Sequence, residues 1–157
     1  MLNRLQDVFK SFQQHEVKYL VIGEIASILH GVPHATFDLD ILIEPTIKNA
    51  KQLLDALVDA RLGTASLTTP ENILANEITI FKDRVRIDVQ TSTPGIRFED
   101  AWTRRQTITY QEQNFFILSR EDLIASKRAA GRDVDKEDVR LLELNRGSES
   151  DNQPGKQ

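Results

Sequence analysis

Three aspartates stand where the chain could build a divalent-metal site. Asp38 and Asp40 are one residue apart at the start of a β-rich run, and side chains at i and i+2 of a strand point to the same face. Two carboxylates held side by side repel each other, so a fold that keeps them together usually neutralises them with a cation. All-oxygen ligands favour magnesium, manganese or calcium. Taken alone, such a doublet is more typical of a solvated strand end.

Asp88 adds a third carboxylate if its strand lies beside that of Asp40. Apolar and polar residues alternate over 84–90, which predicts a half-buried strand with Asp88 on its polar face. Three carboxylates can hold two divalent ions ~3.5–4 Å apart, the arrangement used for in-line phosphoryl or nucleotidyl transfer. By itself, a polar-face aspartate of this kind is usually just exposed.

The segment before the aspartates predicts a seat for phosphate. A buried strand over residues 17–22 runs into Gly23, and a helix follows that ends at Gly31, with Pro33 just beyond. A strand that turns through glycine into a helix N-terminus presents free backbone N–H groups, which bind phosphate. The aspartate pair comes about fifteen residues after Gly23. Phosphates and metal ions would then lie together, as a nucleoside triphosphate with magnesium requires.

The remaining elements must position these side chains. Apolar residues recur at helical spacing near the start of the chain and again after the aspartate pair, which predicts amphipathic helices over 2–12 and 50–58. Ser119 with Asp122 three residues on resembles a capping box, so a helix should follow to Ala130. The expected strands cover 17–22, 38–44, 77–81, 84–90 and 115–118, and the last helix covers 134–144.

This order of elements predicts one α/β (α+β) domain, a small mixed β-sheet flanked by helices. We expect residues 1–145 to form that single domain, because no linker or internal repeat divides them. Residues 61–76 are rich in small and polar side chains and are expected to form an irregular loop, long enough to suggest a role around a site. From residue 146 no apolar side chain follows, and a disordered tail is expected over 146–157.

Composition and charge exclude several classes of protein. The chain has 157 residues, 39% hydrophobic and 28% charged, which is typical of a globular domain. The absence of cysteine excludes disulfides and thiolate metal sites and favours a reducing cytoplasm. A net charge of −4 gives no strongly basic nucleic-acid footprint, and no apolar run approaches the ~18–20 residues needed to span a bilayer. We therefore expect a cytoplasmic protein without a membrane partner.

The combined pattern resembles the nucleotidyltransferase superfamily, in particular its small minimal nucleotidyltransferases and the AbiEii-like proteins associated with toxin–antitoxin systems. That family has a hydrophobic strand, a glycine followed by glycine or serine, a helix and then Asp-x-Asp, with a third aspartate on a later strand. The positions that match here are Gly23, Gly31, Thr36, Asp38, Asp40 and Asp88. The resemblance spans residues 19–144, and its second half covers 122–127 with Arg132, Asp135 and Asp138.

The resemblance implies a nucleotidyltransferase fold and an activity that needs Mg²⁺ or Mn²⁺. The enzyme would transfer a nucleoside monophosphate from a nucleoside triphosphate to an RNA or protein acceptor. Asp38 and Asp40 would bind both ions, and Asp88 would bind the catalytic ion and help to activate the attacking group. The residues expected to hold the nucleotide are Gly23, Glu24, Thr36, Lys127 and Arg132.

Two positions depart from the family pattern. Glu24 stands where the family has glycine or serine, and its charge would weaken triphosphate binding unless it turns away or binds a cation. His34 replaces a frequent arginine, and a neutral histidine lacks the permanent charge and forked donors of that residue. These departures support an alternative function, a catalytically impaired nucleotidyltransferase-fold binding protein, such as the toxin–antitoxin component that binds a small partner protein.

Several other charged residues have two interpretations. Lys127 and Arg132 could simply complement a helix C-terminus, or, by resemblance to the AbiEii-like proteins, reach the triphosphate or acceptor. Asp135 and Asp138 could be only the acidic first turn of a helix. Five arginines could form a basic rim for an acceptor, although interspersed acids favour a solvated surface: Arg84, Arg86, Arg97, Arg104 and Arg105. The histidines are too scattered for a zinc site.

Overall fold

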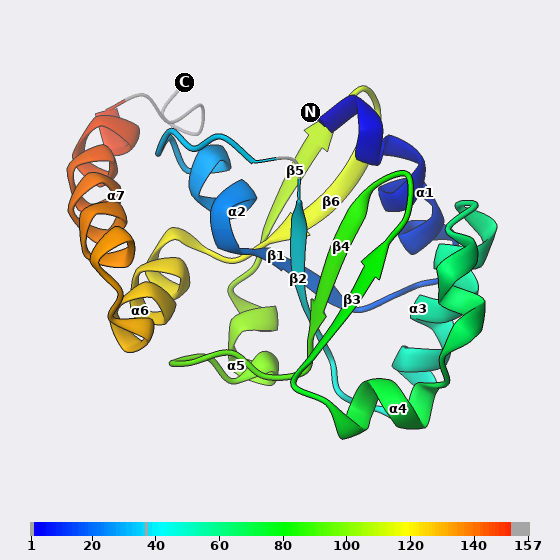
Figure 1. The fold of residues 1–157 in the computed structure, drawn as a ribbon. Helices are drawn as coiled ribbons and strands as arrows, with labels where there is room; N and C mark the ends of the chain where they lie inside the picture. The colour runs from blue at the N-terminus through cyan, green and yellow to red at the C-terminus, as the bar shows by residue number, and fades with distance from the viewer. Residues whose placement is uncertain (1, 37, 152–157) are drawn as a thin grey trace.

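The structure is a computed structural model that describes residues 2–36 and 38–151. A six-stranded sheet is flanked by helices on both faces (Figure 1). In chain order the elements are η1 (Leu2–Leu5), α1 (Gln6–Gln14), β1 (Tyr19–Ile22), α2 (Gly23–Leu29), β2 (Leu39–Ile43), α3 (Ile47–Asp59), η2 (Gly63–Leu67), α4 (Pro70–Ala75), β3 (Ile78–Lys82), β4 (Arg86–Gln90), α5 (Phe98–Thr103), β5 (Gln106–Tyr110), β6 (Gln113–Ile117), α6 (Arg120–Ala130) and α7 (Asp133–Asp151).

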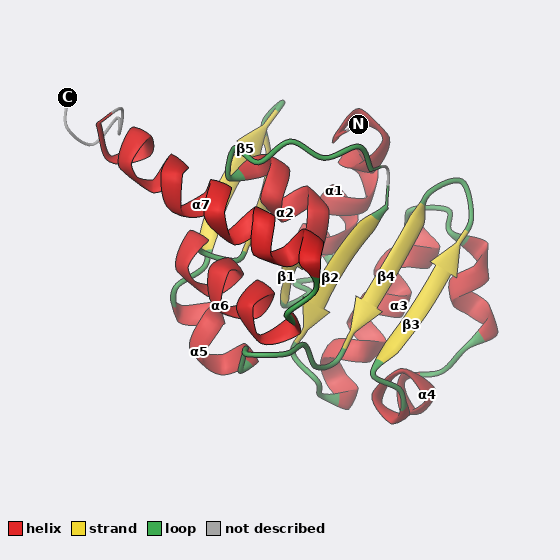
Figure 2. Cartoon of the chain, turned by 60° about the vertical axis from the view of Figure 1, so that its left-hand side comes forward, coloured by secondary structure: helices red, strands yellow, loops and turns green. Residues whose placement is uncertain are grey.

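The sheet is mixed, as the sequence predicts. Its strand order is β3-β4-β2-β1-β6-β5. β2 pairs in parallel with β4 and antiparallel with β1, and β1 pairs in parallel with β6. The two innermost strands, β1 and β2, carry mostly buried apolar side chains on both faces, whereas β4 alternates buried apolar with part-exposed polar residues. Helices α2, α6 and α7 lie on one face, and α1 and α3 lie on the other (Figure 2).

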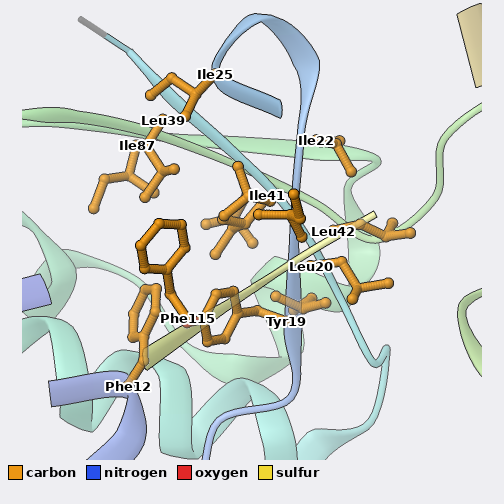
Figure 3. Packing of buried hydrophobic residues seen from close by; sticks show 14 of the residues in the cluster. Phe12, Tyr19, Leu20, Ile22, Ile25, Leu39, Ile41, Leu42, Ile87 and Phe115 are labelled. Carbon is orange, nitrogen blue, oxygen red and sulfur yellow. The ribbon is translucent and has the colours of Figure 1, made fainter. Parts of the chain in front are cut away.

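The core packs α1 against the sheet through aromatic rings. Phe12 and Tyr19 have ring centroids 4.8 Å apart, and Phe9 stacks on Phe115 at 4.4 Å. Figure 3 shows Phe12, Tyr19 and Phe115 converging beneath the apolar residues of β1 and β2. Aromatic pairs at these separations add to the burial of apolar area. This layer anchors β1, whose C-terminal end leads directly into the candidate site.

The sequence prediction for residues 61–76 is wrong. The segment forms η2 and α4, with Ala65 and Ile73 buried. The Thr69 hydroxyl caps α4 by accepting a hydrogen bond from the Asn72 backbone N–H at 3.2 Å, and Pro70 occupies the first helical position. This cap with a following proline is a helix-start signal that outweighs the small and polar composition. The segment packs on α3 and does not border the aspartates.

Other boundaries also differ from the prediction. The structure adds α5 and the edge strand β5, whose mostly exposed side chains give little hydrophobic signal. The last helix continues to Asp151, past the predicted end at Leu144 and into the predicted disordered tail. The rest of that tail, 152–157, lies outside the described residues. Across the described ranges, no helix combines the length and apolar character needed to cross a membrane.

The predicted start and end of α6 are confirmed. The Ser119 hydroxyl accepts a hydrogen bond from the Asp122 backbone N–H at 3.1 Å. Gly131 ends the helix in the left-handed conformation, with φ +69°. The chain then turns directly into α7, so the end of α6 and the start of α7 form one wall beside the sheet (Figure 2).

Candidate active site

The three predicted carboxylates come together on one face of the sheet. β2 and β4 are parallel neighbours, and Asp40 lies opposite Asp88 in their register. Residues at paired positions point to the same face, and neighbouring strands are ~4.8 Å apart. Asp38 precedes Asp40 by two residues and lines the same cavity. The pairing therefore comes from strand order, which brings residues 40 and 88 side by side.

Gly23 is required by the position of Asp40. It begins α2 with φ +71°, and a Cβ atom placed on it would lie 2.4 Å from Asp40 Oδ2. No side chain fits at that distance, and L residues disfavour this backbone region. The absence of a side chain lets the helix start close against the carboxylate, so the predicted phosphate seat and the aspartates share one space.

The carboxylate face is short of positive charge. Burial, with Asp88, Asp38 and Glu24 nearby, raises the pKa of Asp40 from 3.8 to about 7. Arg86 provides positive charge next to these carboxylates. Its guanidinium donates to both oxygens of Asp88, at 2.9 and 3.2 Å, and its Nε lies 3.8 Å from Asp38 Oδ2. The pKa of Arg86 is raised by these contacts, chiefly by its hydrogen bonds to Asp88.

The donor set suits a hard divalent cation, although it is not arranged as a finished ligand cluster. Carboxylate oxygens are the ligands that Mg²⁺ and Mn²⁺ prefer, and the pKa of Asp40 is raised chiefly by burial and then by the neighbouring carboxylates. Across the described residues, no three His, Asp or Glu side chains are placed so that they could hold an ion as they stand. Arg86 occupies both oxygens of Asp88. A metal ion would therefore compete with Arg86 for the oxygens of Asp88.

A cavity of about 320 Å³ lies between the carboxylates and the α6–α7 wall. It is lined by all eight residues predicted to bind metal or nucleotide: Gly23, Glu24, Thr36, Asp38, Asp40, Asp88, Lys127 and Arg132. Thr36 also shapes the approach to β2, since its hydroxyl accepts a hydrogen bond from the Asp38 backbone N–H at 3.2 Å. Residues distant in sequence therefore surround one polar space.

This geometry agrees with what the chain resembles. A family model described as "Nucleotidyltransferase of unknown function (DUF6036)" matches residues 2–147. The chain belongs to this family. It is also similar to the crystal structure of "a putative nucleotidyltransferase" from Thermotoga maritima, with a TM-score of 0.55, 14% identity and 92% of each chain covered. At that identity the likeness establishes the fold, which confirms the predicted nucleotidyltransferase fold. A search of curated proteins found no match.

In this nucleotidyltransferase-family chain, the two predicted nucleotide-binding cations already have partners. Lys127 is only 6% exposed, and its Nζ donates to Asp138 Oδ2 at 2.8 Å and lies 3.8 Å from Asp135 Oδ1. Arg132 donates to both oxygens of Asp135, at 2.7 and 3.0 Å, which lowers the pKa of Asp135. These contacts hold the cations at the cavity wall, so Asp135 and Asp138 do more than complement a helix terminus.

The two departures from the family pattern meet at the same wall. His34 Nε2 lies 2.9 Å from both oxygens of Asp138, and its Nδ1 lies 3.9 Å from Glu24 Oε1. The side chain of Glu24 is about half exposed. His34 thus joins α7 to the start of α2, while Glu24 lines the cavity near Arg132 and, after Asp135, contributes to raising the pKa of that guanidinium.

The five arginines of the predicted basic rim are dispersed, as expected for a solvated surface. Arg84 pairs with Asp7, Arg104 pairs with Asp122, and Arg97, which precedes α5, lies near acids of the first turn of that helix. The guanidinium of Arg105 lies 3.9 Å from the centre of the Trp102 ring. Of these five, Arg86 alone faces the carboxylates. The spacing Arg86-x-Asp88 within one predicted strand is the signal that could have identified it, because i and i+2 share a face.

Proposed function

We propose that this chain is a metal-dependent nucleotidyltransferase that moves a nucleoside monophosphate from a nucleoside triphosphate to an acceptor hydroxyl. The observation that carries the proposal is the opposition of Asp40 and Asp88 on parallel strands, beside Asp38 and the Gly23 turn. The family and the fold support it. Asp38 and Asp40 would hold Mg²⁺ or Mn²⁺ jointly with Asp88.

Each wall of the cavity would have a separate task in this reaction. The bound ion supplies positive charge at the α-phosphate and the leaving pyrophosphate. The turn at Gly23 lets the triphosphate approach the backbone. Thr36 stabilises the segment that leads into β2, because its hydroxyl accepts the hydrogen bond from the Asp38 N–H. Lys127 and Arg132 face the anionic substrate from the opposite wall. Asp88, at the β3 side of the site, would orient and deprotonate the attacking hydroxyl.

Thermal shift with the four nucleoside triphosphates, with and without magnesium or manganese, tests the proposal directly. Ligand that binds the native state raises its melting temperature by mass action. We expect a metal-dependent rise with at least one triphosphate, and its loss in Asp40→Asn and Asp38→Asn. The Asp55→Asn variant is a matched control, because Asp55 lies on α3 and does not line the cavity. The absence of any metal-dependent shift in the wild-type protein would refute the proposal.

A second candidate is a catalytically impaired binding protein, such as an AbiEii-like toxin–antitoxin component with a small partner protein. Two observations favour it: Glu24 places a carboxylate in the cavity, and Arg86 neutralises Asp88 without a metal. This candidate predicts that a complex with the product of a neighbouring gene survives Asp40→Asn. A pull-down in which that substitution abolishes the complex would count against it.

A further inference from the structure

A second cavity lies at the opposite end of the central strands from the carboxylates. Its volume is about 630 Å³, about twice that of the candidate active site, and the two cavities share no lining residue. Tyr19, at the start of β1, lines the second cavity, whereas Ile22, at the end of β1, lines the first. Three residue steps along a strand cover ~10 Å. The second cavity is therefore a separate space, which the proposed nucleotidyl transfer does not use.

One wall of this second cavity is a continuous row of aromatic rings from α1, β1, β6 and α5. The ring centroids of Phe12 and Tyr19 are 4.8 Å apart. The Phe116 ring lies 5.7 Å from that of Tyr19 and 5.3 Å from that of Trp102. All four residues line the cavity. Ligand cavities of about 300–1,000 Å³ are typically lined by apolar and aromatic side chains, so this row suits a planar aromatic group.

Internal contacts hold two walls of the second cavity in place. The guanidinium of Arg105 lies 3.9 Å from the centre of the Trp102 ring, and its Nη1 donates to the Trp102 carbonyl at 2.8 Å. On another wall, the buried Asn49 accepts a hydrogen bond from the Lys18 N–H at 2.9 Å. Its amide nitrogen donates to the carbonyls of Lys18 and Glu44, at 2.9 and 3.0 Å. A preformed cavity binds a ligand with less loss of side-chain entropy.

The rim of the second cavity carries one unpaired charge of each sign. Lys18 and Glu44 pair with each other, with Nζ 3.4 Å from Oε2. The exposed carboxylate of Glu16 and the exposed ammonium group of Lys48 also line the cavity. Neither of them has an ion-pair partner among the side chains that the structure describes. A ligand that carries one positive and one negative group would complement this rim.

Glu16 occupies a backbone position at which glycine is favoured. The Val17 N–H donates to the Phe12 carbonyl at 3.0 Å, and the Glu16 N–H donates to the Gln13 carbonyl at 3.2 Å, which is the Schellman pattern at the end of α1. Glu16 has φ +55°, in the left-handed region that L residues disfavour. Residues held in such conformations concentrate at functional sites, including those that bind ligands. The chain thus places a carboxylate, where a bare turn would suffice, at the mouth of the cavity.

We propose that the second cavity binds a free aromatic amino acid. The ring would lie on the aromatic row, the α-ammonium group would pair with Glu16, and the α-carboxylate would pair with Lys48. An aromatic residue within a polypeptide lacks these two charges, and an aliphatic amino acid lacks the ring, so each would match only part of the lining. The inference is independent of the proposed nucleotidyl transfer, because Asp38, Asp40 and Asp88 do not line this cavity.

The fluorescence of Trp102, the single tryptophan of the chain, reports binding in this cavity. The full chain is titrated with L-phenylalanine and with four probes that lack defined features, and calorimetry gives the affinities. Phenethylamine lacks the carboxylate, 3-phenylpropionate lacks the ammonium group, N-acetylphenylalaninamide lacks both charges, and L-leucine lacks the ring. We expect a saturable change with L-phenylalanine. Binding should be about threefold weaker without one charge, as for an exposed ion pair, and about tenfold weaker without the ring.

Two substitutions of exposed side chains assign the contacts. Glu16→Gln should weaken the binding of L-phenylalanine and phenethylamine about threefold and leave that of 3-phenylpropionate unchanged. Lys48→Gln should weaken the binding of L-phenylalanine and 3-phenylpropionate and leave that of phenethylamine unchanged. Glu112→Gln and Lys51→Gln are the matched controls, because both residues are exposed and lie outside the cavity. Glu112 also has a left-handed backbone, with φ +67°.

Three outcomes would overturn the proposal of an amino-acid site. The first is the absence of a saturable change with L-phenylalanine. The second is equally tight binding of N-acetylphenylalaninamide or L-leucine, which would show that the cavity takes a residue of a polypeptide or any apolar side chain. The third is full affinity for L-phenylalanine in both Glu16→Gln and Lys48→Gln. Binding of L-phenylalanine by a chain that shows no metal-dependent shift with nucleotide would support this inference and refute only the proposed function.

Discussion

The two charged clusters of the cavity differ in how their charges are balanced. On the β2–β4 face, Asp38, Asp40 and Asp88 share one arginine, and the pKa of Asp40 is raised to about 7. On the α6–α7 wall, Lys127 and Arg132 are matched by Asp135 and Asp138. The first cluster carries excess negative charge that a cation would relieve. The second is a closed ion-pair network, which holds helices together and fixes cations at the cavity.

We expect the largest effect on the free energy of unfolding from breaking the ion-pair network of the α6–α7 wall. Lys127→Ala leaves Asp138 buried without its ammonium partner, and breaking a buried pair in this way costs ~3–5 kcal/mol. Urea unfolding should show the loss. Lys136→Ala is the control, because Lys136 and Asp133 form an exposed pair, and such pairs contribute little. Equal small effects of both substitutions would show that the α6–α7 network does not stabilise the fold.

On the carboxylate face, removal of a charge is expected to raise the stability of the protein. Asp40→Asn should stabilise the metal-free protein at pH 8 by about 2 kcal/mol, because one pKa unit corresponds to ~1.4 kcal/mol and the site is partly hydrated. The pKa of Asp40 is 3.8 when unfolded and about 7 when folded. The wild-type protein should therefore lose stability relative to the variant as pH rises from about 4 to 7, and the difference should vanish below that range. Denaturant titrations in chelator at several pH values measure this, and a destabilised variant at pH 8 would contradict it.

Gly23→Ala should disturb the carboxylate face by sterics. The left-handed conformation at Gly23 alone costs ~1–2 kcal/mol with a side chain, and the new Cβ would also displace Asp40. The melting temperature of the variant and its rise on adding nucleotide should both be smaller than in the wild-type protein. Gly63→Ala is the matched control, since nothing lies within 4 Å of a Cβ placed there. If both glycine variants behave alike, close approach of Asp40 is not the reason for glycine.

We expect the smallest effect from removing Arg86, the side chain that neutralises Asp88, and the effect should be on the affinity for Mn²⁺. Arg86→Ala should tighten Mn²⁺ binding, measured by calorimetry, up to tenfold, or ~1.4 kcal/mol, because Asp88 no longer has to release its arginine. Arg84→Ala is the control, since Arg84 pairs with Asp7. Weaker Mn²⁺ binding in Arg86→Ala would mean that Arg86 holds the carboxylates in place for the metal.

Local patterns predicted the elements that carry the site. The apolar run of β1, the break at Gly23, the alternation along β4 and the cap at Ser119 all lie within a few residues of what they specify. Hydrophobic period and capping chemistry act over such distances, so they can be read directly. They gave the mixed sheet, the aspartate doublet and the helix that carries Lys127. The Thr69-Pro70 helix start was equally local and was outweighed by composition.

The tertiary structure decided which charges meet. Strand order places Asp40 against Asp88, and the return of α7 brings Asp138 to both Lys127 and His34. These contacts join residues far apart in the chain, and their free energy depends on burial and distance, which no periodicity encodes. The residue types and spacings therefore determined the fold and the candidate carboxylates. Only the folded chain showed that the charges of one set balance one another, whereas three carboxylates of the other set share a single arginine.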